Sequence, residues 1–184
     1  MVFDAGKRWK IQGRNSGDNM GTIKSATFPI GDPVFQAGFP RRRRLRILVA
    51  DDHPIVRRSL KGILERIGFR VIAEASNGEE AVARAVALKP DVAVLDIAMP
   101  VKNGIDAAQE ILATVPKTKT ILLTVHREGH YVRQALRAGV RGYVVKSRSS
   151  EELVQAIYTV YQGKTYLSVE IDPEIVRDYP LKTH

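Results

Sequence analysis

The sequence of 184 residues contains no cysteine. Disulfide bonds and thiolate metal sites are therefore excluded, and any metal ion must be held by oxygen atoms or imidazole. No stretch approaches the roughly 18 uninterrupted apolar residues of a membrane-spanning helix, and the first ten residues lack the apolar centre of a signal peptide. These absences predict a cytoplasmic protein that has no membrane partner.

Acidic residues are scarce in the first quarter of the chain. Residues 1–46 contain ten Lys or Arg and three Asp, whereas the remainder contains 19 basic and 17 acidic residues. Residues 1–44 are rich in Gly, Pro, Asn and Ser and predict a flexible basic tail. The tail ends in four consecutive arginines, 41–44, which could contact nucleic-acid phosphates. Because no aromatic residues are interleaved with the arginines, a solvated linker is favoured.

Short apolar runs alternate with longer stretches of helical spacing from Leu45 onward. The alternation predicts a doubly wound α/β domain over residues 45–165, in which a five-stranded parallel sheet has helices on both faces. Residues 166–184 remain as a short C-terminal linker. The predicted strands cover 45–50, 69–75, 91–96, 120–125 and 141–146, and the predicted helices follow each of them.

Polar residues follow the predicted strands at the carboxyl edge, where such sheets bind ligands. Three neighbouring carboxylates repel one another unless a cation neutralises them, and oxygen ligands suit Mg²⁺. Asp96 could also attack phosphorus to form an aspartyl phosphate, whose oxygens Lys146 and Thr124 would contact. The edge residues are Asp51 and Asp52 after the first strand, Asp96 after the third, Thr124 on the fourth and Lys146 after the fifth.

Each of these residues also has an ordinary structural explanation. An Asp pair before a helix commonly caps it, Asp96 could be a turn residue, and Lys146 could be a surface lysine. Thr124 and Tyr143 are residue types enriched in strands. The joint placement of the set at strand ends favours a functional site. His53 follows the Asp pair, but no spaced set of further ligands accompanies it, which favours a surface role.

Four segments resemble the receiver domain of two-component response regulators. They are ADDHP (50–54), LDIAMPVKNG (95–104), LLT (122–124) and GYVVKS (142–147), in the family's order. The resemblance implies a flavodoxin-like fold with strand order 2-1-3-4-5 and phosphorylation of Asp96 by a sensor histidine kinase. It also implies that Lys146 contacts the phosphoryl group, and that Mg²⁺ is held by Asp51, Asp52, Asp96 and the Ala98 carbonyl.

The same resemblance implies a conformational switch rather than an enzyme. Thr124 would move toward the phosphoryl group and Tyr143 would turn inward, which biases a two-state packing arrangement. We expect a phosphorylation-dependent homodimer through the faces near the last two helices, where Leu153, Ile157 and Tyr161 lie. The alternative is a Mg²⁺-dependent phosphatase-like enzyme on this fold, which would need an Asp-x-Asp run where residues 51–55 read DDHPI.

ADDHP, GVRGYVVKS and GKTYLS are similar to the NarL/FixJ subfamily with LuxR-type effectors. Members of that subfamily regulate transcription and continue into a helix-turn-helix domain. After Ser168 only 16 residues remain in this sequence. The effector domain is therefore expected to be absent, and direct DNA binding is not expected from this chain.

Overall fold

A computed structural model of the chain describes residues 44–146, 150–168, 171 and 175. The predicted basic tail, apart from Arg44, lies outside the described residues, as does most of the predicted C-terminal linker. Within the described ranges, no helix combines the length and the apolar character needed to cross a bilayer.

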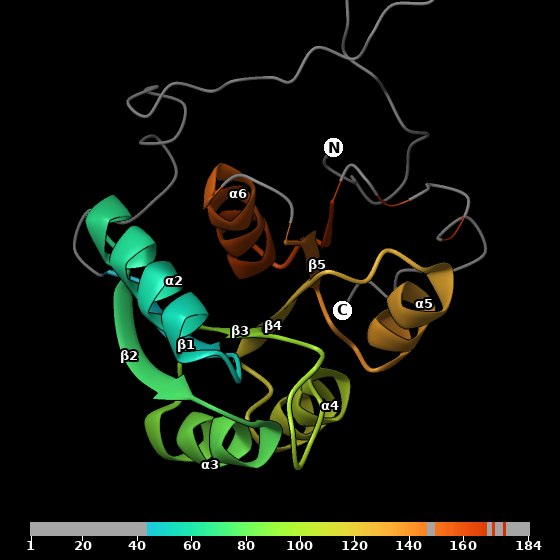
Figure 1. Ribbon diagram of the computed structural model, residues 1–184, viewed down its shortest axis with the longest axis horizontal. Coiled ribbons are helices and arrows are strands. Elements are labelled where there is room, and N and C mark those ends of the chain that lie inside the picture. Colours follow the sequence, from blue (N-terminus) through green and yellow to red (C-terminus); the bar gives the residue numbers. More distant parts are fainter. Residues whose placement is uncertain (1–43, 147–149, 169–170, 172–174, 176–184) are drawn as a thin grey trace, which may run out of the picture. The chain divides into compact units, whose positions relative to one another are not determined.

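Strands and helices alternate along the described chain (Figure 1). All five predicted strands are present, and their observed ends differ by no more than one residue from the predicted ones. The elements are β1 (Arg46–Ala50), α2 (Pro54–Ile67), β2 (Arg70–Ala75), α3 (Gly78–Leu88), β3 (Val92–Leu95), α4 (Gly104–Thr114), β4 (Lys119–Thr124), α5 (Gly129–Arg137), β5 (Gly142–Val145), α6 (Ser150–Tyr161) and β6 (Tyr166–Leu167).

The strands form one parallel sheet in the order β2-β1-β3-β4-β5-β6. This order confirms the predicted 2-1-3-4-5 arrangement, but the prediction of five strands missed β6. A strand of two residues is too short to show an apolar period. Ser168 continues the pairing, because its backbone N–H donates to the Tyr143 carbonyl and its Oγ accepts from the Val145 N–H, each at 2.9 Å.

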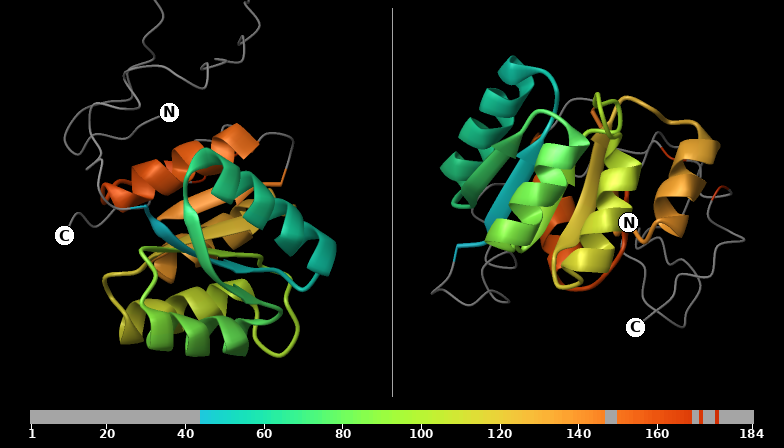
Figure 2. Two further views of the ribbon diagram at one scale, coloured as in Figure 1. Left: turned by 90° about the vertical axis from the view of Figure 1, so that its left-hand side faces the viewer. Right: turned by 90° about the horizontal axis from the view of Figure 1, so that it is seen from below.

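Helices cover both faces of the sheet (Figure 2). One apolar cluster packs side chains of α3, α4 and α5 against the sheet, and a second cluster packs α2 and α6 against the opposite face. Strands β3 and β5 are buried along their whole length, as expected for central parallel strands. Leu153 and Ile157 of α6 are 3% and 0% exposed. The prediction that they form a dimer surface is therefore wrong, whereas Tyr161 is exposed.

Local signals in the sequence set the helix ends next to the carboxyl edge of the sheet. The Asn77 side chain accepts a hydrogen bond from the Glu80 N–H at the start of α3, and Asn103 caps α4 in the same way. At the opposite edge, Gly68 ends α2 in a left-handed conformation, with φ of 108°, just before β2 begins. The two asparagine caps fix where α3 and α4 begin relative to the strands before them.

Candidate functional site

The two acidic strand ends lie side by side because β1 and β3 are adjacent and parallel. Ala50 pairs with Leu95, and Asp51 and Asp96 follow these two residues directly. The Asp96 N–H donates to the Ala50 carbonyl at 2.8 Å, which ties the two strand ends together. Asp51 is 1% exposed and Asp96 is 6% exposed. Two carboxylates are thus buried close together, an arrangement that requires a compensating positive charge.

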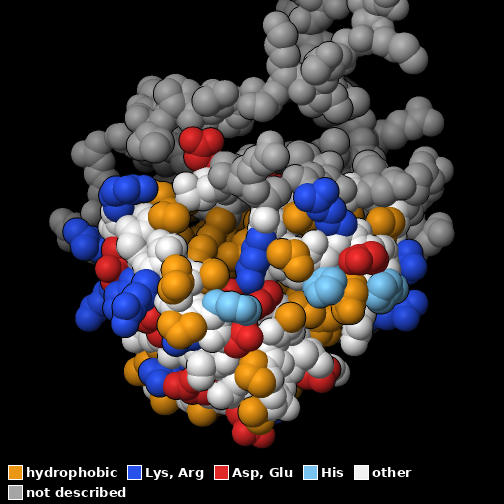
Figure 3. All heavy atoms as spheres, viewed as in Figure 1, with side chains coloured by type: hydrophobic (Ala, Val, Ile, Leu, Met, Phe, Trp, Pro, Cys, Tyr) orange, Lys and Arg blue, Asp and Glu red, His pale blue; other side chains and the backbone are white. Residues whose placement is uncertain are grey.

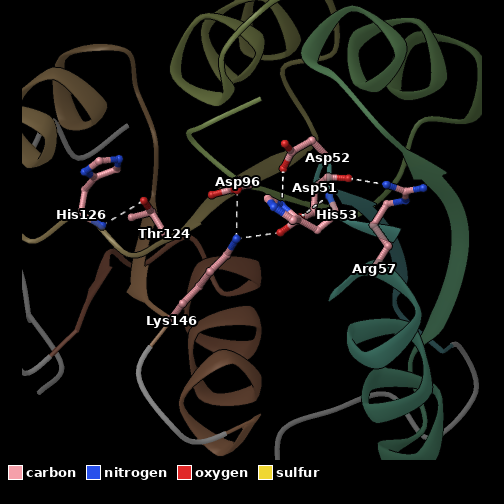
Figure 4. A network of polar contacts seen from close by, with 8 residues as sticks. All are labelled: Asp51, Asp52, His53, Arg57, Asp96, Thr124, His126 and Lys146. Carbon is pink, nitrogen blue, oxygen red and sulfur yellow. Dashed lines mark hydrogen bonds and ion pairs between the residues drawn. The ribbon is translucent and has the colours of Figure 1, made fainter. Parts of the chain in front are cut away.

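Lys146 brings that charge from the end of β5. Its Nζ lies 2.7 Å from Oδ2 of Asp51 and 2.9 Å from Oδ2 of Asp96 (Figure 4). Burial acts to lower the pKa of Lys146, but the hydrogen bonds and negative charges of the two aspartates together outweigh it and raise the pKa. The amine is therefore held in its charged form between the carboxylates.

Asp52 differs from the other two aspartates because its Oδ1 faces an imidazole: Nδ1 of His53 lies 2.6 Å away and forms an ion pair with it when the histidine is protonated. Its Oδ1 is buried, and no hydrogen-bond partner for it exists among the described residues. Ligand atoms of Asp51, Asp52 and His53 all lie within 4.8 Å of one another. Carboxylate oxygens are the donors that Mg²⁺ takes, and the buried Oδ1 of Asp52, which accepts no hydrogen bond from the described residues, fits a bound cation.

This donor group shares two residues with the metal set predicted from the sequence. Asp51 and Asp52 belong to both sets, but Asp96 is absent from the observed group and its Oδ2 contacts Lys146 instead. Ala98 lies on the exposed loop that follows Asp96. The structure adds His53, for which a surface role was predicted; its side chain is 70% exposed.

A close backbone approach sets the position of Asp96. The Gly104 N–H donates to the Ile97 carbonyl at 3.0 Å, which brings the first turn of α4 against the end of β3. A Cβ atom at Gly104 would lie 1.9 Å from the Asp96 carbonyl oxygen. Only glycine allows this approach, so residue 104 determines how the chain leaves the site.

Thr124 and Tyr143 lie on the other side of the site, and the same backbone residue contacts both hydroxyls. The His126 N–H donates to Thr124 Oγ1 at 3.2 Å, and the Tyr143 hydroxyl donates to the His126 carbonyl at 3.0 Å. Thr124 is 0% exposed and Tyr143 is 1% exposed. Burial, followed by the charges of Glu128 and Tyr131, raises the pKa of Tyr143. The tyrosine is therefore in an inward position.

Similarity to known proteins agrees with this geometry. The family described as "Response regulator receiver domain" matches residues 47–158. The chain belongs to the response regulator receiver family. Such receivers are the signalling domains of two-component systems, and NarL- and LuxR-type response regulators are among the members similar to this chain.

Two curated relatives illustrate the similarity. The transcriptional regulatory protein LnrK of Bacillus subtilis is 35% identical over 136 residues, which cover 73% of this chain and 62% of LnrK. The oxygen regulatory protein NreC of Staphylococcus haemolyticus is 34% identical over 142 residues, which cover 76% of this chain and 65% of NreC. The receiver chain thus spans less than two thirds of the length of either relative.

Solved structures agree at the level of the fold. A LuxR-family two-component response regulator from Aurantimonas sp. SI85-9A1 superposes with a TM-score of 0.69 at 35% identity, covering 74% of this chain and 98% of that one. The signal receiver domain of the response regulator NarL from Mycobacterium tuberculosis gives a TM-score of 0.64 at 33% identity, with coverage of 66% and 98%. The receiver fold predicted from the sequence is confirmed.

Proposed function

We propose that this receiver accepts a phosphoryl group on Asp96 from a sensor histidine kinase. The observation that carries the proposal is the placement of Lys146 Nζ between the carboxylates of Asp51 and Asp96. In the transfer, an Asp96 oxygen attacks phosphorus, a new O–P bond forms, and the P–N bond to the donor imidazole breaks. Mg²⁺ held by Asp51, Asp52, Asp96 and the Ala98 carbonyl would stabilise the negative charge of the transferred group.

Lys146 and Thr124 are proposed to bind phosphoryl oxygens. Lys146 already lies 2.9 Å from Asp96 as a charged amine and needs only to release one carboxylate contact to reach an added anion. The Thr124 hydroxyl accepts from the His126 N–H, so its own proton remains available for donation. A shift of Thr124 toward Asp96 would pull on its hydrogen bond to the His126 N–H. Because the His126 carbonyl accepts the hydrogen bond of Tyr143, a displaced His126 backbone would in turn disturb Tyr143.

The surface around the site supports the proposal that a kinase binds there. Three exposed apolar side chains come from the elements that border the carboxyl edge of the sheet: Ile55 at 80%, Val101 at 74% and Val125 at 65%. Figure 3 shows histidine, acidic and basic side chains together at the centre of the face in view, with hydrophobic side chains beside them. An apolar rim around a charged centre suits a protein that carries the phosphoryl donor.

Mass spectrometry after incubation with acetyl phosphate and Mg²⁺ tests the proposal. We expect one added phosphoryl group that is lost with hydroxylamine, and none in Asp96→Asn. Asp106→Asn is the matched control, because Asp106 is an exposed aspartate on α4 and should leave labelling unchanged. Labelling of the Asp96 variant would contradict the assignment, and sustained turnover of a generic phosphoester would favour the phosphatase-like alternative.

A phosphorylation-dependent homodimer is the proposed output, with transcription control exerted through a partner or a further domain. The exposed sides of α5 and α6, including Tyr161, remain available for it. Sedimentation velocity with beryllofluoride and Mg²⁺ should show a dimer for the wild-type protein and a monomer for Asp96→Asn. A wild-type protein that remains monomeric with the mimic would count against dimerisation, while leaving the phosphorylation assignment intact.

A further inference from the structure

The chain stays attached to the receiver after β6. The Ser168 N–H donates to the Tyr143 carbonyl at 2.9 Å, and the Ile171 N–H donates to the Ser168 carbonyl at 3.0 Å. Ile171 is 4% exposed and belongs to the apolar cluster that α3, α4 and α5 form against the sheet. Residue 171 therefore belongs to the core, although it lies in the segment predicted to be a linker.

Ile175 lies against the first turn of α5. It is partly buried, and like Tyr131 it packs on the same apolar cluster. A Cβ atom at Gly129, the first residue of α5, would lie 3.1 Å from both Cδ1 and Cγ1 of Ile175. Because these contacts leave little room for a side chain at residue 129, Ile175 covers this end of α5. Two isoleucines four residues apart thus attach the C-terminal segment to the core and to α5.

The same turn of α5 contacts the residue that bonds to both buried hydroxyls. The ring centroids of His126 and Tyr131 lie 4.3 Å apart. The His126 backbone bonds to the hydroxyls of Thr124 and Tyr143. Packed side chains move between discrete arrangements and do not deform continuously. A displaced His126 would therefore change the surface of α5 on which Ile175 packs.

We propose that Ile175 covers the first turn of α5 in the unphosphorylated receiver, and that phosphorylation of Asp96 releases it. The inference rests on the proposed function, in which Thr124 shifts toward the phosphoryl group and displaces the His126 backbone. Ile171 stays in the core, so only the chain beyond it leaves α5. The docked segment is thus an autoinhibitory contact, because it covers apolar surface that its release makes available to a second copy of the chain or to a partner.

The absence of cysteine allows a single introduced thiol to report on the segment. In Ile175→Cys of the full chain, we expect a maleimide to react about tenfold faster with beryllofluoride and Mg²⁺ than without them, because release exposes the thiol. Adding Asp96→Asn should abolish the acceleration. The matched control is Val86→Cys, at an exposed position of α3, which should react at the same rate in both conditions.

Tryptic cleavage after Arg177, two residues beyond Ile175 in the sequence, gives a second measurement on the wild-type protein. We expect faster cleavage with beryllofluoride and Mg²⁺, and fast cleavage of Ile175→Ser without them. Fluorine NMR records whether the mimic is bound. A bound mimic that changes neither labelling nor cleavage would overturn the inference while leaving the proposed function intact. Failure of the wild-type protein to bind the mimic would overturn both.

Discussion

The two sides of the site use their polar groups in opposite ways. On the acidic side, Asp51 and Asp96 depend on Lys146 for charge compensation, and the buried Oδ1 of Asp52 accepts no hydrogen bond from the described residues and contacts only the exposed imidazole of His53 among them. On the hydroxyl side, Thr124 and Tyr143 are fully buried, and both hydroxyls bond to the backbone of one residue. The acidic side can therefore still bind a cation or a phosphoryl group. The hydroxyl side can respond to such binding only if Thr124 or Tyr143 gives up its hydrogen bond to the His126 backbone for another partner.

The largest expected effect comes from removing the lysine that compensates the acidic side. Lys146→Met would leave two buried carboxylates facing each other, and we expect the free energy of unfolding to fall by about 3 kcal/mol. Lys61→Met is the matched control, because the Lys61–Glu74 pair is partly exposed to solvent and should contribute less than about 1 kcal/mol. Urea unfolding measures both, and saturating Mg²⁺ should restore part of the loss in the Lys146 variant only. Equal effects of the two substitutions would show that the buried carboxylates do not depend on Lys146 for charge compensation.

A second prediction concerns the backbone that positions Asp96. A methyl group at residue 104 would overlap the Asp96 carbonyl, so Gly104→Ala should lower the free energy of unfolding by about 2 kcal/mol. It should also slow phosphorylation by acetyl phosphate, since Asp96 must shift. At Gly62 in α2, by contrast, a Cβ atom would meet no neighbouring atom within 4 Å. Gly62→Ala should therefore stabilise the helix by up to about 1 kcal/mol, and a loss of stability there would contradict the steric argument.

The smallest expected effect tests the hydroxyl side. Tyr143→Phe removes the hydrogen bond to the His126 carbonyl and should cost about 1 kcal/mol at neutral pH. Because burial raises the pKa of Tyr143, the unfolded state ionises first as the pH rises above about 10, and the wild-type protein loses stability there. Between pH 8 and about pH 10.5, Tyr143→Phe should therefore lose less free energy of unfolding than the wild-type protein does. Urea unfolding at the two pH values measures this difference.

The exposed Tyr161→Phe is the control for that comparison and should follow the wild-type protein at both pH values. If Tyr143→Phe also followed the wild-type protein, the hydroxyl side would not be held by the bond to His126. Such a result would reduce the contrast with the acidic side.

Much of the fold and of the acidic side could be predicted from residue patterns. Asp51 and Asp96 follow apolar runs that are recognisable strands, and adjacent parallel strands place their carboxyl ends together. The orientation of His53 could not be predicted, because it depends on a hydrogen bond between its own N–H and Asp51. Likewise, nothing in the local pattern indicates that the Ser168 hydroxyl accepts a bond from β5. The burial of Leu153, by contrast, could have been predicted, because Leu153, Ala156, Ile157 and Val160 have the spacing of a core-facing helix side, and the expected dimer surface overlooked it.

The order of apolar runs and helical stretches by itself determined the alternating architecture. The residues after each apolar run determined which functional groups come together at the carboxyl edge of the sheet. This is possible because a buried parallel strand needs a continuous apolar segment and leaves its polar residues at the end. Only the tertiary structure decided which partners those residues take. Lys146 contacts both Asp51 and Asp96, Tyr143 points inward, and His53 turns toward Asp52, since each orientation depends on atoms from distant segments or on local backbone geometry.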